Sequence, residues 1–218
     1  MEADCSTPEF IAIHEAGHAV AHWYTGSKFQ RVFIRSVDEV SAGPYIDSRG
    51  IEHMVAGMVE GERRHHSLFA KTQGQIRSID IEIQDGSTES QAYGATLKKR
   101  QHTLAGIEII HQLAGPIAEA KFLNVQAIAV IIESGRDDWE HAKLIAADVV
   151  RTDEELSSLL EQQELEVRKI FMRPGVWKAV QTLADELLKK HSLNWAEVIS
   201  IIADHTGEAE RPEDILYK

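Results

Sequence analysis

The sequence predicts a mainly α-helical fold with a small β-sheet or hairpin near its N-terminus and a helical bundle at its C-terminus. From Thr96 onward, apolar residues recur at three- and four-residue steps, which is the spacing of amphipathic helices. Residues typical of strands gather instead in the short stretch KFQRVFIRS, residues 28–36. The 218 residues are 43% hydrophobic and 27% charged, so the chain can bury a normal core, and we expect one domain.

The first helix is expected to follow a capping box and to stop at a glycine. Ser6 and Glu9 have capping-box spacing, Pro8 suits a first helical turn, and Gly26 is typical of a C-terminal stop. After the strand at 28–36, the stretch SAGPYIDSRG predicts a turn and a second short strand, and its proline favours an edge position.

The middle of the chain is less regular than the rest. IDIEIQDG alternates like a half-buried strand, whereas EGERRHHS is typical of a solvated loop, and we expect mobility there. Helices are expected from Thr96, from about Arg136, over about 153–172, and over the stretches VWKAVQTLADELLKK and WAEVISII, residues 176–190 and 195–202. We therefore divide the single domain 1–218 into 1–50 (first helix and edge strands), 51–95 (variable and mobile) and 96–218 (helical).

The composition excludes several classes of partner. A net charge of −12 argues against nucleic acid and against anionic membrane surfaces. The longest apolar run, VQAIAVII, is far shorter than the roughly 20 residues of a membrane helix, so we expect no membrane insertion. The single cysteine, Cys5, cannot form an internal disulfide, and no basic and apolar leader opens the chain, so a cytoplasmic location is expected.

The stretch HEAGH, residues 14–18, has the spacing of a catalytic metal motif on a helix. His14 and His18 lie four residues apart, so one helical face can present both imidazoles to one Zn²⁺ ion. Glu15 lies beside that face and could take a proton from a zinc-bound water, whose pKa falls from about 15.7 to about 7. With 11 histidines in the chain a chance match is the alternative, but a buried polar cluster without a partner would be costly.

Catalytic zinc usually has three protein ligands, so a third must come from elsewhere. His22 lies one turn past His18 on the same helix, and three such positions cannot surround one ion, so we expect it to pack nearby. Two acidic residues are candidates: Glu119 on an apolar helix, and Asp138 at the start of a helix after a glycine-containing turn. The physics of the sequence does not choose between them.

Three motifs in the right order resemble a known family. HEAGHAV, LAGPIAEA and SGRDDWEHAKLIAADVV are similar to the HEAGHA, GGRAAEE and SNDL motifs in the zinc peptidase domain of FtsH-type AAA+ proteases. The C-terminal helices also resemble that domain, so the likeness covers most of the chain. It departs at Pro116, where the family has arginine, and at Ala120, where it has a second glutamate.

The resemblance implies a helical, zincin-like peptidase in which Asp138 joins His14 and His18 as the third zinc ligand and Glu15 is the general base. It implies that Glu119 orients a histidine by a hydrogen bond. It also implies that the stretch RVFIRS…AGPYI, residues 31–36 and 42–46, is a short edge strand beside the active site, which can hold an extended substrate by main-chain hydrogen bonds. Because only 13 residues precede His14, we expect no ATPase module before it, and hence an ATP-independent zinc metalloendopeptidase acting on peptides or unfolded segments. Further copies of the chain and a separate ATPase are the protein partners that the family suggests.

Two other functions fit the same residues. The expected lack of an ATPase module and the altered glycine-rich helix favour a zinc-stabilised module that binds a partner and cleaves nothing. Against this, such a site needs no general base and normally fills its fourth position with protein. The other is a peptidase that is latent because residues 60–95 cover its own site.

Overall fold

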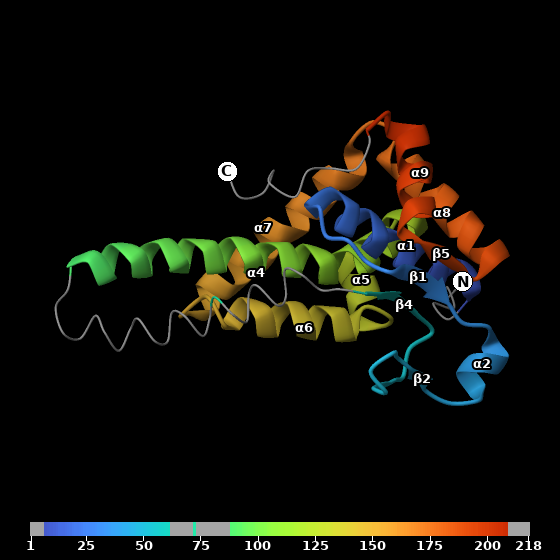
Figure 1. Cartoon of the computed structure of the whole chain (residues 1–218), viewed down its shortest axis with the longest axis horizontal. Coiled ribbons are helices and arrows are strands. Elements are labelled where there is room, and N and C mark those ends of the chain that lie inside the picture. The colour runs from blue at the N-terminus through green and yellow to red at the C-terminus, as the bar shows by residue number, and fades with distance from the viewer. Residues whose placement is uncertain (1–6, 62–71, 73–87, 209–218) are drawn as a thin grey trace.

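The computed structural model describes residues 7–61, 72 and 88–208, and these residues form a mainly helical body with a small sheet (Figure 1). The predicted fold class is therefore confirmed. The strand expected at IDIEIQDG lies outside the described residues. The elements, in chain order, are α1 (Pro8–Thr25), β1 (Arg31–Ile34), α2 (Val37–Ser41), β2 (Tyr45–Ile46), β3 (Glu52–His53), β4 (Gly57–Glu60), α4 (Thr88–Leu123), α5 (Ala127–Ile132), α6 (Arg136–Ala147), α7 (Asp153–Met172), α8 (Val176–Lys190), β5 (Ser192–Asn194) and α9 (Trp195–Thr206).

Helix α1 lies at the centre of the fold and packs against α4 and α8. Its small buried residues allow this close approach: a Cβ added at Gly17 would lie 2.7 Å from the carbonyl oxygen of Ala114 on α4. The helix ends as predicted at Gly26, which takes the left-handed conformation with φ 71°. Its N-cap is Thr7, which makes no side-chain cap, and Ser6, at which the capping box was expected, lies outside the described residues.

The sheet combines strands from both ends of the chain. Its order is β4-β1-β5, with both pairs antiparallel, and β2 pairs with β3 in a separate hairpin. Strand β1 lies within the stretch predicted from residues 28–36, but the edge position expected for it is wrong. Strand β5, from a C-terminal segment where no strand was expected, pairs with β1 on the side opposite β4, so β1 is the central strand. Among the described strands β4 is an edge, and its Gly57 lies next to α1.

The long helix α4 runs alongside α6 (Figure 1). It begins at Thr88, eight residues before the predicted start, and continues through Pro116. Helix α6 begins at Arg136, and α7 spans Asp153–Met172, both as predicted; α7 begins with a capping box between Thr152 and Glu155. Every described helix is too short or too polar to cross a membrane.

Candidate metal centre

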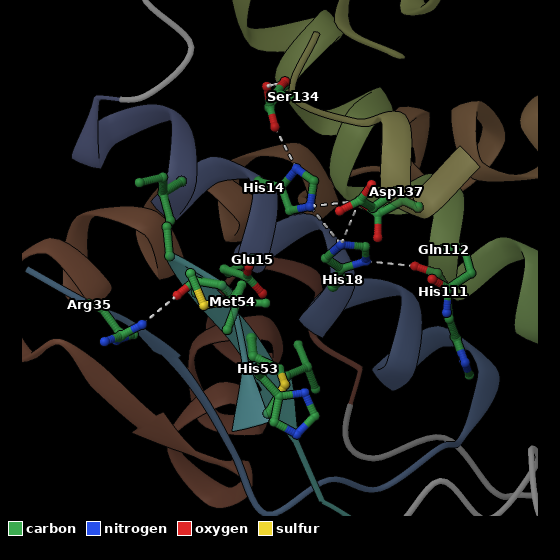
Figure 2. A pocket seen from close by; sticks show the side chains of 18 of the residues that line it. His14, Glu15, His18, Arg35, His53, Met54, His111, Gln112, Ser134 and Asp137 are labelled. Atoms are coloured by element: carbon green, nitrogen blue, oxygen red, sulfur yellow. Dashed lines mark hydrogen bonds and ion pairs between the residues drawn. The ribbon is translucent and has the colours of Figure 1, made fainter. Parts of the chain in front are cut away.

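Two helices bring His14, His18 and Asp138 together. The histidines lie one turn apart on α1, and Figure 2 shows their imidazole rings turned toward one another. Their Nε2 atoms are 2.8 Å apart. Oδ2 of Asp138, from the first turn of α6, lies 3.0 Å from Nε2 of His14 and 3.7 Å from Nε2 of His18. Within the described part of the chain these three form a group that could hold a metal ion.

The outer nitrogens of both rings donate hydrogen bonds, which fixes the tautomer that each neutral ring adopts. Nδ1 of His18 lies 2.6 Å from the backbone carbonyl oxygen of His111, which can only accept a hydrogen bond. Nδ1 of His14 lies 2.5 Å from Oε1 of Glu119. In the neutral rings, each Nε2 therefore carries a lone pair directed into the space that the carboxylate of Asp138 also faces.

This convergence of lone pairs requires a positive charge. Two unprotonated nitrogens and a carboxylate oxygen within 3.7 Å of one another repel unless a proton or a metal ion lies among them. A tetrahedral zinc ion with bonds of about 2.0 Å separates its ligand atoms by about 3.3 Å, which lies inside the range of the three separations. The residues therefore fit a metal ion.

The titration of these groups agrees with a site that attracts positive charge. Burial alone would lower the pKa of His14, but hydrogen bonds to Asp138 and Glu119 outweigh it and hold the pKa well above its usual value. For Asp138, burial favours the neutral acid, but the contacts with His14 and His18 dominate and hold the pKa well below its usual range. A metal ion and a proton would thus compete for the same position.

Gly115 on α4 leaves room for the two imidazoles. A Cβ added there would lie 2.5 Å from Nε2 of His14 and 2.5 Å from Nε2 of His18. Real Cβ contacts of that length essentially never occur. Only glycine at this position allows α4 to approach the two rings so closely.

Glu15 lies beside the group rather than in it. Glu15 is only 6% exposed, and this burial raises the pKa of its carboxyl group. Oε2 of Glu15 has no hydrogen-bond partner among the described residues, although such groups are normally paired. Gly57 at the start of β4 makes room for this side chain, because a Cβ there would lie 2.6 Å from Cγ of Glu15. The acid is thus held next to the metal ligands with one oxygen available.

A cleft of about 700 Å³ gives access to the centre. Its walls come from α1, β4 and α2 on one side and from α4 and α6 on the other, and β4 contributes Gly57, Met58 and Val59. Part of the wall near α2 is an apolar rim of exposed side chains, namely Val37, Val40 and Met54. The guanidinium of Arg35 holds this region in place by donating to the backbone carbonyls of Glu39, Gly43 and Val55 (Figure 2 shows Arg35 and Met54).

The structure gives different positions to the two acids, Glu119 and Asp138, that the sequence left as candidates for the third ligand. Asp138 faces the inner nitrogens, as the family resemblance implies, whereas Glu119 is 2% exposed and bonds the outer nitrogen of His14. His22 stays outside the group and stacks on the ring of His111, with ring centroids 3.9 Å apart. Sequence reasoning did not find Ser134, whose Oγ donates to Oε2 of Glu119 at 2.7 Å.

None of the protein-family models searched matches this chain, and no curated protein matches it.

Proposed function

We propose that this chain is a zinc metalloendopeptidase that hydrolyses peptide bonds in peptides or unfolded segments without ATP. The observation that carries the proposal is the pairing of a three-ligand group with a buried carboxylate. His14, His18 and Asp138 supply three ligand atoms, and Oε2 of Glu15 is available beside them. Three protein ligands leave a coordination position open, which is typical of catalytic zinc.

The residues have distinct roles in this mechanism. When bound, the ion would polarise the scissile carbonyl and make water nucleophilic at neutral pH. Glu15 accepts the proton of the attacking water and then donates it to the leaving amine. Glu119 and the His111 carbonyl keep the imidazoles of His14 and His18 in the ligating orientation.

The cleft favours an extended polypeptide as substrate. Strand β4 lines the cleft and is an edge strand of the described sheet, so a substrate segment can pair with it through main-chain hydrogen bonds. The apolar rim (Val37, Val40 and Met54) offers contacts to substrate side chains. Hydrolysis of a peptide or an unfolded segment at this site needs only water and the proposed metal centre, which is why we propose turnover without ATP.

The test is a comparison of Glu15→Gln with the parent protein in zinc content and in cleavage of an unfolded fluorogenic substrate without ATP. Glu15→Gln should retain about one zinc per chain and lose at least about 100-fold in kcat, the usual contribution of a general base. Glu9→Gln is the matched control, because this exposed acid lies in the first turn of the same helix. Zinc retention without any cleavage by the parent would support the binding module instead, and equal cleavage by Glu15→Gln would refute the role of Glu15.

A further inference from the structure

Ser134 is connected to the metal centre through Glu119. Its Oγ donates to Oε2 of Glu119 at 2.7 Å, and Oε1 of the same carboxylate accepts from Nδ1 of His14 at 2.5 Å. The carboxylate thus has one oxygen on the ligand histidine and the other on the serine. Because Glu119 is 2% exposed, water has little access to replace either hydrogen bond.

The same short segment also delivers the third ligand. Ser134 lies four residues before Asp138, in the turn between α5 and α6. Gly135 brings this turn against α4, since a Cβ there would lie 2.7 Å from Cβ and Cγ of Pro116. Residues 134–138 therefore act on both nitrogens of His14: Asp138 directly at Nε2, and Ser134 through Glu119 at Nδ1.

Without the hydroxyl of Ser134, the carboxylate of Glu119 would keep only its hydrogen bond to His14. Oε2 would become a buried acceptor without this donor, and the carboxylate could rotate away from the position that His14 requires. Outer hydrogen bonds of this kind fix the ring orientation of a metal-ligating histidine and raise its basicity. Ser134 itself is exposed, so replacing it opens no cavity in the core.

We infer that Ser134 is a positioning residue of the metal centre, acting through Glu119 to hold His14 in its ligating orientation. This inference rests on the proposed zinc site but does not depend on catalysis. It predicts that Ser134→Ala weakens zinc binding by about 10-fold, within the usual range for losing an outer-shell partner. Ser134→Thr keeps the hydroxyl and should restore the parent affinity.

The experiment measures zinc dissociation constants by competition with a chromophoric chelator. Because Ser134 acts through Glu119, Ser134→Ala should cost about 10-fold in the parent and nothing further in a Glu119→Gln background. The visible absorption of the Co²⁺-substituted protein should shift in Ser134→Ala, as expected if the coordination of His14 changes. The matched control is Ser158→Ala, an exposed serine on α7, which contributes no residue to the cleft.

The outcomes of this experiment distinguish a failure of the Ser134 inference from a failure of the proposed function. Unchanged zinc affinity in Ser134→Ala, or an equal loss in the Glu119→Gln background, would overturn the inference while leaving the proposed function intact. A parent protein that binds no zinc would overturn both. Zinc binding by all variants with no peptide cleavage by the parent would overturn the proposed function alone, because the inference is read from affinity and absorption.

Discussion

Replacing Gly115 by alanine tests whether the two ligand histidines need the space that glycine leaves on α4. The new Cβ would lie 2.5 Å from Nε2 of both His14 and His18, whereas ordinary van der Waals contact begins at 3.4 Å, a displacement of about 0.9 Å. Zinc–ligand distances vary by only about 0.2 Å, so the rings cannot move this far and still bind the ion. Zinc affinity should fall by at least about 100-fold, the upper end of the effect of losing an outer-shell partner.

The assay for Gly115→Ala is zinc affinity by chelator competition, with circular dichroism of the metal-free protein to follow folding. Gly106→Ala is the matched control on the same helix, because the three atoms nearest to its Cβ would belong to the flexible side chain of Gln163, the first of them at 3.3 Å. Both substitutions favour the helix by roughly 1 kcal/mol, so neither is expected to unfold α4 through propensity. If Gly115→Ala binds zinc as tightly as the parent does, the ion is not bound at these two nitrogens.

Three further predictions follow from other parts of the structure. Gly57→Ala should keep its zinc but lower kcat by roughly 10- to 100-fold, because its Cβ would displace Glu15; an unchanged kcat in a steady-state assay would contradict this. Free zinc at 100 times its Kd should raise the Tm by roughly 5–10 °C over protein in chelator, and a Tm independent of zinc would exclude binding to the folded state. Backbone hydrogen bonding from Ile51, together with Arg49 and His53, holds the pKa of Asp47 well below its usual range, so its stabilising effect is present above about pH 4 and is lost as the pH falls. Denaturant unfolding should therefore show Asp47→Asn less stable than the parent at neutral pH, with the difference shrinking in acid; a constant difference would refute this.

The first half of the metal centre could be predicted because it depends only on local geometry. His14 and His18 lie four residues apart, and any α-helix places such residues on one face. The apolar pattern and Gly26 predicted that helix without tertiary information. Glu15 followed from the same argument, since it is the direct neighbour of the first histidine.

The second half depends on how α4 and α6 cross α1, and local patterns do not contain that information. Glu119 and Asp138 are both acids on helices, so the physics of the sequence left both open as the third ligand. The family resemblance favoured Asp138, and the structure places Asp138 at Nε2 of His14 and Glu119 at Nδ1. Ser134 gave no sequence signal at all, because a serine in a turn before a helix is common.

Two elements of the fold show different reasons for a missed prediction. Strand β5 has three residues and is extended because it pairs with β1, from the other end of the chain, so its own sequence carries little signal. Helix α2 did carry a signal, since Ser36 and Glu39 have the spacing of the capping box that they form. No helix was predicted for these five residues.

Glu15 is the residue that separates an enzyme from a zinc-stabilised binding module. A buried carboxylate oxygen without a partner costs about 1–3 kcal/mol, a sizeable part of the roughly 5–15 kcal/mol that stabilises a typical domain. The backbone also accommodates this side chain, because β4 has a glycine at position 57, where a Cβ would lie 2.6 Å from it. A zinc ion that only held the fold together would need neither feature, and it would favour a fourth protein ligand, whereas the group within the described residues has three. The position of Glu15 therefore favours a site at which a proton is transferred.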